Sequence, residues 1–97
     1  MKMSFLSIET SLNRIFLVLY CNGNLFSNNK FIESSIEVEI NQMFDDVLSK
    51  GNIVFGELDF IMVSLGPGSY TGTRVGLAAA KAIAISINKP IIGYTNF

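Results

Sequence analysis

The hydrophobic pattern of this chain changes its period near residue 33, and that change limits the folds open to it. Three runs before it, at residues 3–10, 14–21 and 25–31, alternate or are continuously apolar, as in β-strands. After it, residues 36–48 carry apolar side chains at helical spacing, with acidic and polar residues between them. Three strands followed by helix, strand, helix and strand predict a mixed sheet in the element order βββαβαβ.

Turn and cap signals divide the first half of this pattern into elements. Asn22-Gly23 favours a tight hairpin between the second and third strands, because both positions tolerate positive φ. The strand at residues 14–21 is almost continuously apolar, which predicts burial on both faces of the sheet. Ser34 or Ser35 is expected to cap the first helix, and Gly51 to end it in a left-handed conformation.

The second half of the chain alternates strand and helix. Residues 58–65 indicate a buried strand, and residues 71–87 indicate an alanine-rich helix. Pro90 ends this helix, since proline disfavours a helical residue before it. Residues 91–94 begin a last short strand. No repeat or linker interrupts the sequence, so residues 1–97 are expected to form a single domain.

Composition limits the function. The chain has 97 residues, of which 49% are hydrophobic and 15% charged, so it is too apolar to be disordered and has room for one core. A net charge of −1 argues against direct nucleic-acid binding. The absence of histidine removes most zinc sites and every histidine-based triad. One cysteine allows no internal disulfide, as expected of a cytoplasmic protein, and no apolar run is long enough to cross a membrane.

A glycine-rich segment before the second helix is the part of the chain best suited to chemistry. Residues 66–76 (GPGSYTGTRVG) bring glycines, hydroxyls and a cation to a helix start, whose free N–H groups can hold an anion. The candidate anion or nucleotide loop consists of Gly66, Gly68, Ser69, Thr71, Gly72 and Arg74. Its spacing matches neither the dinucleotide fingerprint nor the phosphate loop of NTPases. A purely structural turn, with Thr71 capping the helix, is the alternative.

Two further patterns allow more than one interpretation. Gly72, Gly76, Ala80 and Ala84 recur every four positions, a stripe that lets another backbone approach closely. That backbone is either the sheet of this domain or a helix of a partner. Glu9 ends the first strand alone, and no nucleophile, base and oxyanion donor come together. We therefore expect no catalytic and no metal-binding residues.

Two motifs together resemble the TsaB family, also called YeaZ. They are LSIETS at residues 6–11 and GPGSYTGTRVG at residues 66–76, which match the family's I-D-T-S/A strand and its G-P-G-S-[FY]-T-G-x-R-[IV]-G segment. Glu9 stands where the family usually has aspartate. The resemblance implies an α/β, ribonuclease-H-like and actin-like (ASKHA) lobe, consistent with the order βββαβαβ. Because family members have two lobes, it identifies residues 1–97 as the N-terminal lobe, with the second lobe absent.

The resemblance also implies a function. TsaB takes part in forming threonylcarbamoyladenosine, the modified base beside the anticodon of tRNAs that read codons beginning with A. It is a non-catalytic partner of the TsaD transferase and acts together with TsaE. We therefore expect a scaffolding protein without catalytic activity of its own, with TsaD-like and TsaE-like partners, and a homodimer when alone.

Two enzyme-class alternatives stay open beside the scaffold. One is a nucleotide-binding half-site of an actin-like ATPase, with ATP and magnesium bound only in complex with a partner. The other is a glycoprotease-like peptidase of the M22 type, for which the chain offers no base or metal-ligand set.

In family members the first-lobe helices form the dimer surface, including the contacts to TsaD. The resemblance therefore assigns a partner interface to the wide apolar face of the first helix and the small stripe of the second. The expected interface residues are Ile36, Ile40, Met43, Phe44, Val47, Gly76 and Ala80.

Overall fold

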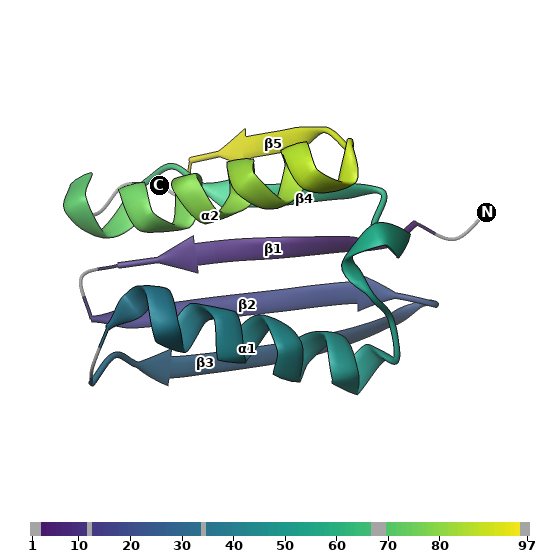
Figure 1. Cartoon of the computed structure of the whole chain (residues 1–97), viewed down its shortest axis with the longest axis horizontal. Coiled ribbons are helices and arrows are strands. Elements are labelled where there is room, and N and C mark those ends of the chain that lie inside the picture. Colours follow the sequence, from purple (N-terminus) through teal and green to yellow (C-terminus); the bar gives the residue numbers. More distant parts are fainter. Residues whose placement is uncertain (1–2, 12, 34, 67–69, 96–97) are drawn as a thin grey trace.

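The computed structural model describes residues 3–11, 13–33, 35–66 and 70–95, with the backbone alone for residues 70–72. Two helices lie on one face of a five-stranded sheet (Figure 1). In chain order the elements are β1 (Phe5–Thr10), β2 (Arg14–Cys21), β3 (Asn24–Phe31), α1 (Ile36–Gly51), the short 3-10 helix η1 (Phe55–Glu57), β4 (Phe60–Ser64), α2 (Tyr70–Ile87) and β5 (Ile91–Tyr94).

The sheet is mixed, with strand order β3-β2-β1-β4-β5. Antiparallel pairing joins β1 to β2 and β2 to β3, whereas β4 pairs in parallel with both β1 and β5. The helices α1 and α2 supply the crossovers that parallel neighbours require. The predicted element order βββαβαβ is thus confirmed, while η1 was not predicted.

A two-residue turn connects β2 to β3. Asn22 and Gly23 have φ angles of 53° and 79°, and Cys21 pairs directly with Asn24. Positive φ at both central residues matches the right-handed twist of the flanking strands. The predicted Asn-Gly hairpin is confirmed, and it fixes the register that brings alternate residues of β2 to the core.

The ends of α1 differ from the prediction. Ser35 is the N-cap residue, but its hydroxyl donates to the Glu37 carboxylate at 2.7 Å instead of capping the backbone. Asn52, with φ of 53°, adopts the left-handed conformation that was expected of Gly51. Gly51 is the last helical residue, and a Cβ there would lie 2.6 Å from Leu19 Cδ2. This glycine therefore serves close packing, and assigning it the left-handed role was wrong.

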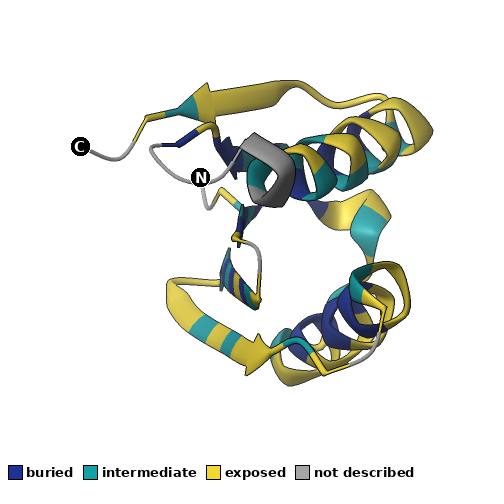
Figure 2. Ribbon diagram, turned by 90° about the vertical axis from the view of Figure 1, so that its left-hand side faces the viewer, coloured by how far each residue is buried: buried dark blue, intermediate teal, exposed yellow. Residues whose placement is uncertain are grey.

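A single core lies between the sheet and the two helices. Alternate strand residues and one stripe of each helix supply its buried side chains, which are Leu6, Ile8, Ile15, Leu17, Leu19, Cys21, Ile40, Met43, Phe44, Val47, Leu48, Leu58, Ile61, Val63, Ala80 and Ala84. The strand β2 alternates between buried and less buried residues. Its predicted burial on both faces was wrong, because both helices lie on the same side of the sheet (Figure 2).

The small stripe of α2 packs against the sheet of this chain. The Gly76 N–H donates to the buried Oγ1 of Thr10 at 3.1 Å, and a Cβ on Gly76 would lie 2.6 Å from that oxygen. Ala80 is fully buried and Ala84 is 5% exposed. Of the two interpretations of the stripe, the structure therefore shows close helix-on-sheet packing.

Candidate functional site

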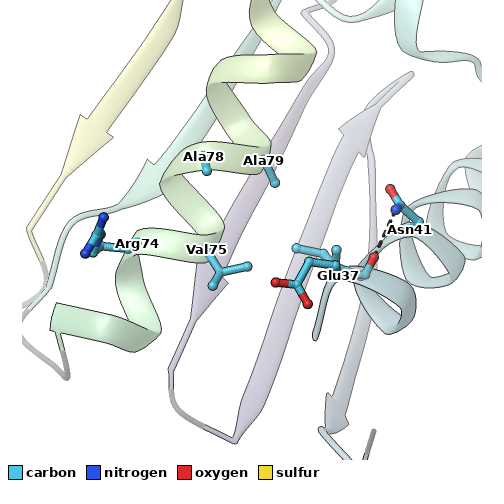
Figure 3. Close-up of a pocket in the computed structure, with 7 residues that line it drawn as sticks. Glu37, Asn41, Arg74, Val75, Ala78 and Ala79 are labelled. Atoms are coloured by element: carbon cyan, nitrogen blue, oxygen red, sulfur yellow. Dashed lines mark hydrogen bonds between the residues drawn. The ribbon is translucent and has the colours of Figure 1, made fainter. Parts of the chain in front are cut away.

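A groove of about 580 Å³ lies between α1 and α2 on the helical side of the sheet (Figure 3). The start of α1 forms one wall, and the first half of α2 forms the other. Its lining residues are Glu37, Ile40, Asn41, Arg74, Val75, Ala78 and Ala79.

The position of α1 is fixed from its far side. The buried Glu39 carboxylate accepts a hydrogen bond from the Glu33 N–H at 3.0 Å and forms an ion pair with Lys30 Nζ at 3.0 Å. Lys30 lies on β3 and Glu33 in the connection that follows it. Glu39 therefore ties the start of α1 to the edge strand, away from α2.

The position of α2 is set by its contact with the central strand. Gly76 brings the first half of α2 close to Thr10 at the end of β1. Facing α1 from this part of α2 are Val75 and Ala79, with Ala78 beside them (Figure 3). These side chains are short, so the space between the helices is not filled by the described residues.

The two walls differ in charge and polarity. Ser35 donates to the exposed Glu37 carboxylate, and this hydrogen bond holds the pKa of Glu37 below its ordinary value. The Asn41 side chain donates to the Glu37 carbonyl oxygen at 2.9 Å, which leaves the Asn41 amide oxygen at the rim. The α2 wall contains no acidic residue, and its cation, Arg74, points away from Glu37 (Figure 3). The α1 wall of the groove thus carries a carboxylate and an amide, and the α2 wall opposite it consists of short apolar side chains.

Most of the residues predicted for a partner interface lie inside this chain. Ile40, Met43, Phe44, Val47 and Ala80 are at most 4% exposed, and Gly76 is buried against Thr10. Ile36 is half-buried against the same core. The side chains that are at most 4% exposed face the sheet and are not available to a partner in this fold. Ile36 is partly accessible, so its place in the interface stays a prediction. The outward positions of the groove belong to Glu37, Asn41 and Ala78 instead.

The predicted anion loop falls largely outside the described structure. Gly68 and Ser69 lie outside the described residues, and of Thr71 and Gly72 the structure gives the helical backbone alone. Gly66 is buried with φ of 131°, a conformation that favours glycine. Arg74 is exposed and lines a second hollow of about 340 Å³, with Leu65, Thr73 and Lys81 among its other residues. The loop prediction stays a prediction.

Sequence reasoning did not single out the residues that open the groove. Glu37, Asn41, Val75 and Ala79 flank the buried stripes, one helical step to the side, and the exposed Ala78 lies beside them. These residues can be recognised in the sequence only by their position beside the apolar stripe of each helix. That position indicates a groove only when the strands that each helix covers are known. Within the described residues, no group of His, Cys, Asp and Glu could hold a metal, and no helix is long and apolar enough to cross a membrane.

Comparison with known proteins finds similarity both to TsaB and to TsaD proteins. Residues 33–96 match the family model described as TsaD, tRNA N6-adenosine threonylcarbamoyltransferase. The tRNA threonylcarbamoyladenosine biosynthesis protein TsaB of Buchnera aphidicola (subspecies Acyrthosiphon pisum) is 32% identical over 87 residues, which cover 90% of this chain and 39% of that protein. A tRNA N6-adenosine threonylcarbamoyltransferase of Clostridioides difficile is 41% identical over 54 residues, 56% of this chain and 16% of that protein.

A solved structure matches the fold closely. The crystal structure of a Pseudomonas aeruginosa protein described as similar to the peptidase YeaZ superposes with a TM-score of 0.90 at 21% identity. It covers 97% of this chain and 44% of that one. This likeness confirms the predicted α/β, ribonuclease-H-like and actin-like fold class. The chain spans 39% to 42% of the length of the first curated relatives it matches.

Proposed function

The chain belongs to the family of tRNA threonylcarbamoyladenosine proteins that contains TsaB (YeaZ) and TsaD, and from this membership we propose that it takes part in forming threonylcarbamoyladenosine on tRNA. Its role is that of a non-catalytic partner that binds and orients a TsaD-like transferase. Residues 1–97 correspond to the N-terminal lobe of such a partner. No catalytic step is assigned to the described residues, which contain no cluster of metal ligands.

The observation that carries this proposal is the groove between α1 and α2. It is open to solvent and presents short side chains on the α2 wall and an anionic rim on α1. Short side chains let the backbone of another helix come close, and the charged rim then selects its orientation. A helix of the transferase partner, with apolar residues toward Val75 and Ala79 and a cation toward Glu37, fits these walls.

The test is binding of this chain to the TsaD-like protein of the same organism, measured by light scattering behind size exclusion and by calorimetry. A one-to-one complex is expected. Asn41→Lys places a long cation in the groove, and we expect it to weaken binding at least about tenfold, a loss of about 1.4 kcal/mol.

Gln42→Lys is the matched control. Gln42 is the exposed neighbour of Asn41, receives the same added charge, and lines a hollow on the β3 side of α1. It should bind like the wild type. Equal binding by both variants would remove the groove from the interface, and the absence of any complex would contradict the partner role itself.

The finer partner assignments are part of the same proposal. A TsaE-like ATPase joins the assembly of chain and transferase, and no described surface of this chain is assigned to it. In the absence of the transferase the chain forms a homodimer. Adding purified TsaE-like protein to the one-to-one complex should give a larger species in light scattering, and an unchanged mass would contradict its membership.

A further inference from the structure

Three asparagines of the described chain have a left-handed backbone conformation. Asn22, Asn52 and Asn88 have φ angles of 53°, 53° and 56°. Asn22 lies in the turn between β2 and β3 (Figure 1), Asn52 caps the C-terminal end of α1, and Asn88 directly follows α2. Because the three share one conformation, a chemical difference among them depends on the residue that follows each and on its contacts.

An asparagine side-chain amide can react with the backbone nitrogen of the next residue. Two of the three following nitrogens are held in hydrogen bonds at helix ends. The Ile53 N–H donates to the Leu48 carbonyl oxygen at 3.1 Å, and the Lys89 N–H donates to the Ala84 carbonyl oxygen at 3.0 Å. The third following nitrogen is that of Gly23, whose N–H has no hydrogen-bond partner among the described residues.

The side chain of the following residue adds to this difference. To react, the backbone nitrogen has to approach Cγ of the asparagine, and a side chain on the same residue hinders that approach. Ile53 has a branched side chain and Lys89 a long one, whereas Gly23 has none. Gly23 therefore resists ring closure less than the other two residues.

The side chain of Asn24 favours the reaction from the other side of the turn. Its Nδ2 donates to the carbonyl oxygen of Asn22 at 3.4 Å. This oxygen belongs to the same peptide unit as the Gly23 nitrogen, so it takes up negative charge when that nitrogen loses its proton. A donor placed where negative charge develops stabilises the reacting form. Asn24 thus promotes deprotonation of the Gly23 nitrogen.

We propose that Asn22 is a site of spontaneous deamidation. The Gly23 nitrogen forms a bond to Cγ of Asn22, the bond between Cγ and the side-chain nitrogen breaks, and ammonia leaves with the proton that the Gly23 nitrogen loses. Water then opens the resulting succinimide ring at either of its carbonyl groups. The products are aspartate and isoaspartate, and in isoaspartate the main chain runs through the side-chain carbon.

Both products change the hairpin. Each adds a negative charge at residue 22, and isoaspartate also lengthens the main chain inside the turn. Cys21 pairs directly with Asn24 across this turn, so a longer main chain distorts the connection that sets the register of β2 and β3. Accumulation of isoaspartate should therefore lower Tm.

Incubation of the folded chain, followed by peptide mapping with mass spectrometry, tests the proposal. Asn22 should exchange its amide for a carboxyl group at least about tenfold faster than Asn52 or Asn88, a difference of about 1.4 kcal/mol in activation free energy. The rate should rise with pH, because the deprotonated nitrogen is the nucleophile. Asn24→Val removes the donor to the Asn22 carbonyl oxygen and should slow the reaction.

Two control variants separate the causes. Asn22→Gly keeps a turn sequence suited to positive φ, so its Tm should not fall during incubation as that of the wild type does. Lys89→Gly, at an exposed position, creates a second Asn-Gly pair whose glycine N–H keeps its bond to the Ala84 carbonyl oxygen. In this variant Asn88 should react at least about fivefold more slowly than Asn22, the factor for a hydrogen bond of about 1 kcal/mol. In urea the two should react alike.

The comparison within the wild type decides the proposal even if a variant fails to fold. An Asn22 that keeps its amide in the folded chain while it reacts in urea would overturn the proposal, as would equal rates at Asn22, Asn52 and Asn88. Equal rates at Asn22 and Asn88 in folded Lys89→Gly would contradict protection by the hydrogen bond. An unchanged rate in Asn24→Val would contradict the part assigned to Asn24.

Discussion

Replacement of Gly76 by alanine tests how α2 is held on the sheet. In an exposed helix this change stabilises by about 1 kcal/mol, because alanine has the higher helix propensity. Here the added Cβ would lie 2.6 Å from Thr10 Oγ1 and 3.1 Å from Thr10 Cγ2. Thr10 is buried, its side chain is short, and its Oγ1 accepts the Gly76 N–H, so it cannot move away without losing that bond.

Overpacking of this kind costs about 1–3 kcal/mol, which outweighs the gain in propensity. We therefore expect Gly76→Ala to destabilise by about 1 kcal/mol, measured by urea unfolding followed by circular dichroism. For a domain of 97 residues this lowers Tm by about 4–8 °C.

The control for Gly76→Ala is Gly56→Ala, because a Cβ on Gly56 meets no atom within 4 Å. Thr10→Ala should supply room for the new methyl group, so the double variant should be more stable than the sum of the single effects predicts. A Gly76→Ala protein that is more stable than the wild type would contradict this reasoning. It would show that the gain in helix propensity exceeds the cost of placing a methyl group between α2 and β1.

Two further sets of substitutions test the ends of α1. Glu39→Gln should lower the free energy of unfolding in urea by about 1–3 kcal/mol, because the buried carboxylate that accepts from Lys30 and from the Glu33 N–H loses its charge. Lys30→Met should cost less, because the Lys30 side chain is half-exposed, and equal losses would contradict the role of Glu39 in holding the start of α1. Asn52→Ala should lower the free energy of unfolding by about 1 kcal/mol, because Asn52 has a left-handed backbone conformation that alanine disfavours. Asn52→Gly should have an unchanged or higher Tm in thermal melts, and an unchanged Tm for Asn52→Ala would contradict the assigned conformation.

The element order followed from local signals, because each element carries its own pattern. The Asn-Gly turn and the helical spacing from Ile36 to Leu48 depend on neighbours along the chain, and both predictions are confirmed. The left-handed position at the end of α1 was missed because Gly51 and Asn52 are both suited to it. What decides between them is Leu19 on β2, which leaves no room for a Cβ at Gly51. That contact is between distant parts of the chain, and local patterns do not contain it.

The burial of β2 shows the same limit for a whole strand. A continuous apolar run predicts a strand covered on both faces, but right-handed crossovers place α1 and α2 on one face. Phe16 is consequently 39% exposed. Half of the apolar side chains of β2 therefore lie on the sheet face away from the helices. The sequence alone could not show which face of β2 the helices would cover.

The distinction between buried and outward helix residues also decides which variants can test a partner interface. Ile40 and Ala80 are the obvious targets in the sequence, because they lie on the apolar stripe of α1 and on the small stripe of α2. In the structure both are buried against the sheet, so Ile40→Asp places a charge in the core and Ala80→Leu overpacks it. Either variant loses partner binding by losing the fold, whatever the true interface is. Asn41 and Ala78 line the groove and leave the core intact, so a loss of binding in variants at these positions reports on the surface itself.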